Sequence, residues 1–494
     1  MSKLKCFDNE KYLKLQKEQI LDKAKEFDNK LYIEFGGKLF EDYHAARVLP
    51  GFNPNVQVKI LEDLKDSCEL IMCISANDIE DNKIRADFGI TYNLEVIRQI
   101  DNFRSLGIKV RAVAITLFKE QPSAIKFKEQ LELLGESVYY HYYTRGYPSD
   151  VATIVSEEGY GKNPFIETSR PIIVVTAPGP NSGKLATCLS QMFHEYKRGV
   201  KAGYVKFEKF PVWDLDLKDP INMSYEAATA EINDTLMLDS YHFNAYNKIA
   251  VSYNREIQIF PVIYEILKKI TNTNKIKSPT DMGINNISKC IFDKELAQYS
   301  ARQEIVRRYY KAKEENRKGN VSNETVERIK IFMNQLYLSV YDRKCVKFAE
   351  QKEEMSQSPS IAIELNDGTI ITGRKTDLLS ASASVVLNAL KHLAKINDDI
   401  YLIPNHLLEP IQHLKVDILQ SENVLSLKDV LLALNIYATE NKLAKLALSK
   451  IGELKFIEGH STHILFGSNA DTMRKLNIMM TCGDKIQNKR LFFE

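Results

Sequence analysis

Apolar and polar residues along this chain follow two periods, one typical of buried strands and one typical of amphipathic helices. Residues 68–75, which read CELIMCIS, form a nearly unbroken apolar run that predicts a buried strand. Apolar residues then recur at helical spacing from Leu94 to Phe103, and Gly107 follows where a helix end favours glycine. Residues 108–116 predict the next strand. A strand, a helix and a strand in this order indicate a βαβ unit, and therefore a parallel sheet.

The same order of elements returns in the middle of the chain. Residues 172–176 predict a strand, residues 184–198 a helix that ends at Gly199, and residues 202–207 a further strand. The predicted helix has an apolar face made of Leu185, Cys188, Leu189, Met192, Phe193 and Tyr196. This second βαβ pattern again favours a parallel sheet.

The second half of the chain changes character twice. Residues 293–355 are highly charged at helical spacing, and Asn323 suits the N-cap of the second of two helices. Residues 361–374 hold two strand-like runs around Asp367 and Gly368, which is a strong hairpin signal. We therefore predict a multi-domain α/β protein with mostly parallel, Rossmann-like sheets, a helical insertion and a separate α/β C-terminal domain.

The length of the chain supports this division. Its 494 residues are too many for one hydrophobic core, and no internal repeat stands out. We predict an N-terminal α/β domain at 1–165, a second α/β region at 166–295, a helical hairpin at 296–355 and a C-terminal α/β domain at 356–494.

Composition and charge exclude several classes of protein. The net charge is +2 and the charges are well mixed, so we expect no nucleic-acid partner. Seven scattered cysteines without a C-x-x-C pair indicate neither a disulfide framework nor a zinc ribbon. The start of the sequence lacks a signal-peptide core, and no apolar run approaches the roughly 18 residues of a membrane span. We expect a cytoplasmic protein without a membrane partner.

The stretch TAPGPNSGK, residues 176–184, follows a predicted strand and precedes a predicted helix. A phosphate-binding loop has this order, because its backbone N–H groups and the positive helix end bind the anion. We therefore predict phosphate contacts from Gly179, Ser182, Gly183, Lys184 and Thr187. The lysine would add a mobile positive charge. A tight turn that lets strand and helix pack closely remains the alternative.

The stretch departs from the pattern G-x-x-x-x-G-K-[ST] at two positions. Pro178 stands at the first glycine, with Gly179 one residue late, and Leu185 stands where a Ser or Thr would hold magnesium. A magnesium-dependent NTP hydrolase is therefore disfavoured, whereas a phosphate or a nucleotide is not. Asp239, which ends the short apolar run TLML, is a weak match for the acidic partner of such a site.

Other polar residues follow predicted strands. Asp78 and Arg85 lie after the strand 68–75, where open parallel sheets bind ligands, so we predict that they contact substrate. Asp281, in the polar segment 278–286, and His242 are candidates for a general base, and Lys184 for a further catalytic group. We predict no metal site, because the His460 and His463 pair in EGHSTHIL lacks an assignable third ligand.

Several longer segments carry a resemblance to a known family. They read EFGGKLFEDYHAARVLPGF, NDIEDNKIRADFGITY, YEAATAEIND and SPTDMGIN, together with the segment around TAPGPNSGK. From about residue 30 to the C-terminus, the chain closely resembles an uncharacterised bacterial family catalogued as domain of unknown function 1846. The resemblance implies a multi-domain α/β protein with a P-loop-like segment and a distinct C-terminal domain, and it supplies no catalytic residues.

Two hypotheses from different classes follow. The first is an enzyme, of transferase or ligase type, that binds a phosphorylated small molecule or a nucleotide at residues 179–184. The second is a non-enzymatic metabolite-binding or assembly protein. The tyrosine-rich segment 139–150 and the charged helices of 293–355 support the second hypothesis, because both suit a subunit interface of a homo-oligomer.

Overall fold

The computed structural model describes residues 5–37, 39–85, 89–421 and 424–486. The chain divides into two compact units, formed mainly by residues 6–226 with 234–297 and by residues 298–494 with 227–233. We call them the N-terminal unit and the C-terminal unit.

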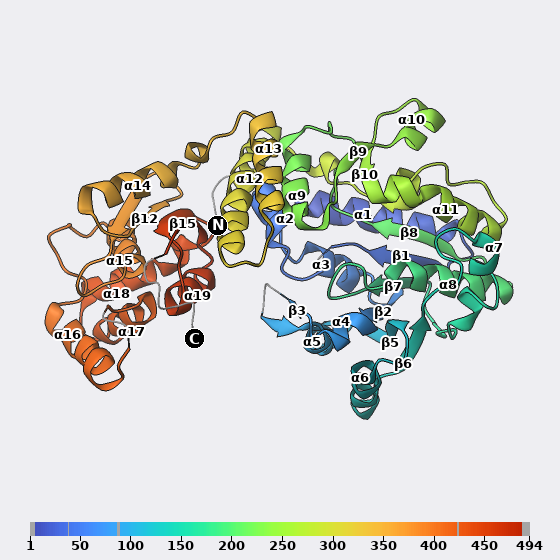
Figure 1. Cartoon of the computed structure of the whole chain (residues 1–494), viewed down its shortest axis with the longest axis horizontal. Coiled ribbons are helices and arrows are strands. Elements are labelled where there is room, and N and C mark those ends of the chain that lie inside the picture. Colours follow the sequence, from blue (N-terminus) through green and yellow to red (C-terminus); the bar gives the residue numbers. More distant parts are fainter. Residues whose placement is uncertain (1–4, 38, 86–88, 422–423, 487–494) are drawn as a thin grey trace. The chain divides into compact units, whose positions relative to one another are not determined.

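A seven-stranded sheet forms the centre of the N-terminal unit (Figure 1). Its strand order is β11-β8-β1-β7-β2-β5-β6, and every neighbouring pair is parallel. The strands are β1 (Leu31–Phe35), β2 (Cys68–Ser75), β5 (Lys109–Phe118), β6 (Val138–Tyr142), β7 (Ile172–Thr176), β8 (Gly203–Phe207) and β11 (Gly283–Ile284). The predicted parallel sheet is confirmed, and it takes strands from both of the regions 1–165 and 166–295.

Helices cover this sheet, because its strands are apolar on both faces. Every side chain of β2 and β7 is buried. The helix α8, which follows β7, packs on β1, β7 and β8, and α11 packs against α8. The helices of this unit are α1 (Asn9–Lys25), α2 (Tyr43–Val48), α3 (Val56–Asp63), α4 (Ala76–Glu80), α5 (Tyr92–Ser105), α6 (Pro122–Leu133), α7 (Val151–Ile154), α8 (Lys184–Lys197), α9 (Pro220–Ala228), α10 (Ser240–Tyr246) and α11 (Asn254–Thr271).

Two short antiparallel pairs accompany the main sheet. One joins β3 (Ile84–Arg85) to β4 (Ile90–Thr91), between α4 and α5. The other joins β9 (Leu236–Leu238) to β10 (Val251–Tyr253), and α10 lies between these two strands in the sequence.

The C-terminal unit has its own four-stranded sheet in the order β13-β12-β14-β15. Its strands are β12 (Ser360–Glu364), β13 (Ile370–Arg374), β14 (Glu458–His463) and β15 (Met479–Lys485). The antiparallel β12–β13 pair confirms the predicted hairpin. The sheet as a whole is mixed, because β14 is antiparallel to β12 and parallel to β15.

Helices make up most of the remaining C-terminal unit. Its core gathers apolar side chains from β12 and from α15, α17 and α18, such as Ile363, Val386 and Leu434. The helices are α12 (Lys294–Arg317), α13 (Asn323–Gln335), α14 (Lys344–Ser356), α15 (Ala381–Leu393), α16 (Asn405–His413), a π-helical turn (Leu414–Ile418), α17 (Leu427–Tyr437), α18 (Lys442–Ser449) and α19 (Gly467–Lys475). The first three fall in or across the predicted helical segment 296–355.

Candidate functional site

The turn between β7 and α8 has a backbone that suits an anion. Asn181 and Gly183 both have positive φ, 55° and 76°, and this alternation curls successive N–H groups toward one side. No side chain caps α8, whose N-cap is Gly183. In the described part of the chain, the N–H groups of Asn181 and of residues 183–186 donate to no protein acceptor. A row of free donors therefore meets the positive end of a 14-residue helix.

Neighbouring side chains fix the shape of this turn. The Thr116 hydroxyl, at the end of β5, donates to the Ser182 carbonyl at 2.8 Å. The Ser182 hydroxyl donates to the Gly179 carbonyl at 2.9 Å, so it closes the turn rather than facing a ligand. A Cβ on Gly179 would lie 2.6 Å from the Tyr92 ring. A Cβ on Gly183 would likewise lie 2.8 Å from Thr116. Close packing thus explains both Gly179 and Gly183, and the case for an anion site rests on the free N–H groups.

Two cationic side chains lie at the turn. The Lys184 ammonium has no hydrogen bond or ion pair with any described residue. Arg255, from the first turn of α11, donates to the Asn181 side-chain oxygen at 3.4 Å. Its guanidinium is held by the buried Asp234 carboxylate at 2.5 and 2.6 Å. Sequence reasoning did not assign Arg255 to the site, because no spacing connects it to Asn181, which lies 74 residues earlier in the chain.

The turn lies where the sheet topology places ligands. The chain leaves β7 toward β8 on one side, whereas it leaves β2 toward β5 on the other. Loops from adjacent strands that run in opposite directions open a crevice at the carboxyl edge of a parallel sheet. The turn 177–183 and the segment after β2 therefore border the same crevice.

The segment after β2 reaches the turn through Tyr92. Asp78 pairs with Lys83 at 3.0 Å, and the Lys83 ammonium lies 5.3 Å from the centre of the Tyr92 ring. This pairing outweighs partial burial and raises the pKa of Lys83. Arg85 lies on β3 opposite Ile90, but its side chain falls outside the described part of the structure. The predicted substrate contacts of Asp78 and Arg85 stay predictions.

Thr187 occupies a different environment from the turn. Its side chain is fully buried on the face of α8 that packs on the sheet. The hydroxyl lies 3.2 Å from His141 Nδ1 and 3.5 Å from the Cys73 thiol. Burial lowers the pKa of His141 to about 3, so the ring is neutral. We therefore leave Thr187 out of the anion site, because its hydroxyl faces the core.

His242 and Asp281 lie together but in a structural network. His242 Nδ1 is 3.1 Å from the buried Ser278 hydroxyl and 4.0 Å from Asp281. Asp281 accepts from the N–H groups of Lys277 and Ser278 at 2.8 and 3.1 Å, and from the Tyr246 hydroxyl at 2.9 Å. Burial and this carboxylate raise the pKa of Tyr246 to about 12. None of these bonds reaches the turn 177–183, so the structure gives no support to either residue as its base.

Carboxylates and histidines supply no metal centre in the described residues, where no three such side chains converge. Asp239, the weak acidic match, accepts from the His242 N–H and from the Thr280 hydroxyl, so it caps α10. His460 is buried and lies 2.9 Å from the Thr481 hydroxyl. None of the helices in the described ranges is long and apolar enough to cross a membrane.

Comparisons with known proteins identify the family. Residues 5–337 match Domain of unknown function DUF1846, N-terminal, and residues 341–492 match Domain of unknown function DUF1846, C-terminal. The chain is 49% identical to a UPF0371 protein of Clostridium tetani (strain Massachusetts / E88) over 99% of both chains. It is 50% identical to a UPF0371 protein of Clostridium botulinum (strain ATCC 19397 / Type A), again over 99% of both. The chain belongs to the DUF1846 family.

Proposed function

We propose that this member of the DUF1846 family binds the phosphate group of a small molecule or a nucleotide at the turn 177–183. The free N–H groups of Asn181 and of residues 183–186, at the uncapped start of α8, carry this proposal. Asn181 is exposed and residues 183–186 are half-buried, so these N–H groups need an acceptor from outside the chain, either water or a bound anion. A phosphate oxygen at a helix N-terminus meets that need.

The proposed roles of the side chains follow from their positions. Lys184, which has no hydrogen bond or ion pair with any described residue, adds a positive charge at the first residue of α8. Arg255 adds guanidinium N–H donors beside Asn181, and its ion pair with Asp234 holds it there. We propose group transfer or ligation rather than magnesium-dependent hydrolysis, because Leu185 stands where a magnesium-binding hydroxyl would be. A nucleotide is then the cofactor or the substrate.

A thermal-shift experiment tests the phosphate site. Wild type, Lys184→Ala and Lys197→Ala are melted with nucleotides, sugar phosphates, phosphate and sulfate, each with and without magnesium. Lys197 is a matched control, since it lies at the far end of α8 and pairs with Glu157. A ligand at one hundred times its Kd stabilises the folded state by about 2.7 kcal/mol, which raises the Tm by about 5 °C for a unit of this size.

The expected result is a shift in wild type and Lys197→Ala that is lost in Lys184→Ala. A shift that requires magnesium would contradict the proposal that ligands bind without magnesium, which rests on Leu185 in place of a Ser or Thr. Absence of a shift with every phosphorylated compound would overturn the proposal and leave residues 177–183 as a packing turn.

A metabolite-binding or assembly protein without turnover is the second candidate. The network around Asp281 and His242 favours it, because both candidate bases are committed to bonds away from the turn. Ligand binding without any turnover would support it. Homo-oligomerisation is part of this candidate, and multi-angle light scattering tests it against the chain mass of 56.6 kDa. Deleting residues 293–355 is a poor test, because Ile305 and Phe332 in that segment are buried.

A further inference from the structure

The C-terminal unit contains a second candidate site, a solvent-open hollow of about 490 Å³. The last turns of α14 form one wall, with Glu350, Glu353 and Glu354, and the loop at Ser358 continues it. His463, the last residue of β14, and Lys485, the last residue of β15, line the hollow as well. A volume of this size accommodates a small molecule.

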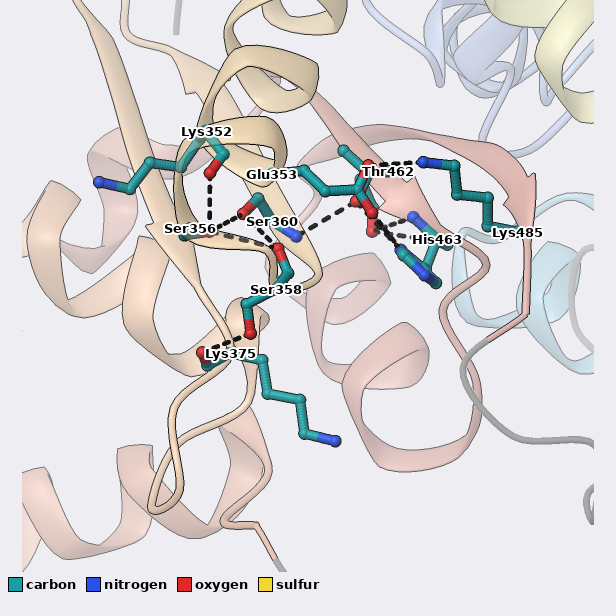
Figure 2. A network of polar contacts seen from close by, with 10 residues as sticks. Lys352, Glu353, Ser356, Ser358, Ser360, Lys375, Thr462, His463 and Lys485 are labelled. Atoms are coloured by element: carbon teal, nitrogen blue, oxygen red, sulfur yellow. Dashed lines mark hydrogen bonds and ion pairs between the residues drawn. The ribbon is translucent and has the colours of Figure 1, made fainter.

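Figure 2 shows how His463 is held in the hollow. Its Nδ1 lies 3.4 Å from a Glu353 oxygen and 3.1 Å from the Thr462 hydroxyl. The other Glu353 oxygen lies 2.8 Å from the Lys485 ammonium. The Ser461 hydroxyl donates to the His463 carbonyl at 2.7 Å, at an irregularity in the β14–β15 pairing. These contacts fix the ring from its Nδ1 side.

The opposite side of the ring is free. Within the described residues, His463 Nε2 has no protein partner, although the side chain is only 15% exposed. Burial holds the pKa of His463 below its ordinary value, Lys485 and Lys375 lower it further, and Glu353 opposes them. The ring is therefore neutral at pH 7, and Glu353 favours the form that keeps the proton on Nδ1 and the lone pair on Nε2.

His460 shows what a purely structural histidine of the same strand looks like. It is 1% exposed, its Nδ1 lies against Thr481, and its ring packs on Tyr310 at 4.7 Å between centroids. His460 is not among the residues that line this hollow, whereas His463 is. The two rings therefore differ in the property that a ligand requires, which is a nitrogen that it can reach.

We propose that His463 is the hydrogen-bond acceptor of a second ligand site, positioned by Glu353, for a small neutral or cationic molecule that bears a hydroxyl group. The hydroxyl group of the ligand donates a hydrogen bond to the lone pair of Nε2, while the carboxylate of Glu353 holds the proton on Nδ1. Three carboxylates and the negative end of α14 outweigh Lys485, which is already paired, so the hollow disfavours an anion. The polar walls disfavour an apolar molecule.

Carbethoxylation by diethyl pyrocarbonate, followed by peptide mass spectrometry of the full chain, tests this site. The reagent acylates unprotonated, accessible imidazole nitrogens, so its rate against pH reports the pKa of each histidine. The probes are choline, a cationic alcohol, and glycerol, a neutral one, with inorganic phosphate as the anionic contrast. His413, whose side chain is 71% exposed, is the internal control for general reactivity. His460 is the buried control.

Support requires three results. His463 reacts with a midpoint below pH 6.5, choline or glycerol slows its reaction at least threefold while His413 is unchanged, and phosphate has no effect. Equal inertness of His463 and His460 would overturn the site. Protection by phosphate alone, or by none of the three probes, would overturn the assigned ligand class.

Two variants separate a positioning role from a structural one. Glu353→Gln removes the carboxylate that opposes the lowering of the His463 pKa, so the midpoint moves to lower pH. Glu354→Gln changes the next residue of α14, which is exposed and lines the same hollow, and leaves the midpoint unchanged. A lower Tm of Glu353→Gln with an unmoved midpoint would show that Glu353 has a structural role only.

Discussion

Gly183→Ala tests the geometry of the turn 177–183 most directly. Gly183 has a φ of 76°, and the added methyl carbon would lie 2.8 Å from both Cβ and Oγ1 of Thr116. The left-handed backbone costs an alanine roughly 1–2 kcal/mol. Forcing a methyl group into the packed space against Thr116 costs a further 1–3 kcal/mol or so. The free energy of unfolding should therefore fall by about 2–5 kcal/mol, and the Tm by about 4–10 °C.

Gly199→Ala provides the matched control. Gly199 ends the same helix with a φ of 83°, and no atom lies within 4 Å of its added carbon. Only the backbone term applies there, so we expect a loss of roughly 1–2 kcal/mol. Circular dichroism melts of both variants measure the difference. Equal losses in the two variants would refute the claim that Thr116 packs tightly under the turn.

Three further predictions concern single charged residues. Arg255→Ala should weaken phosphate binding about tenfold, the effect of one charge-assisted hydrogen bond, and an unchanged Kd by calorimetry would remove Arg255 from the site. Arg343→Met should destabilise the C-terminal unit by about 3 kcal/mol, because this 1%-exposed side chain donates to the Gly459 carbonyl at 2.9 Å and to the Thr481 hydroxyl at 3.0 Å. An Arg343→Met variant that unfolds at the same urea concentration as wild type would contradict this reasoning. Burial raises the pKa of Glu315, but Asn320 and Lys311 outweigh it and lower the pKa from 4.5 to about 2. Glu315→Gln should therefore have a lower free energy of unfolding than wild type at pH 7. This difference should disappear as the pH falls from 4.5 toward 2. A difference that stays constant with pH in urea titrations would argue against the contacts of Glu315 with Asn320 and Lys311.

The amino-acid sequence alone determined the local elements of the first unit. It predicted strands at 68–75 and 172–176, and the structure has Cys68–Ser75 and Ile172–Thr176. It also predicted the helix 184–198, observed as Lys184–Lys197. These elements are predictable because their hydrophobic period and their glycine ends lie within a few consecutive residues. The hairpin of β12 and β13 is predictable for the same reason.

Only the tertiary structure decided which elements are neighbours. The sequence does not show that β7 enters the sheet between β1 and β2, or that β14 and β15 pair in parallel in a mixed sheet. These pairings depend on packing between segments far apart in the chain, which no local period records.

The side chains of the two candidate sites divide in the same way. The sequence predicted Lys184 at the start of a helix. Only the fold brings Arg255 into contact with Asn181 and Glu353 into contact with His463. It also buries Thr187, whose position one turn into α8 faces the sheet. Local patterns fix the backbone of an element, but the side chains that gather around a site come from distant elements, and their meeting is a property of the packed core.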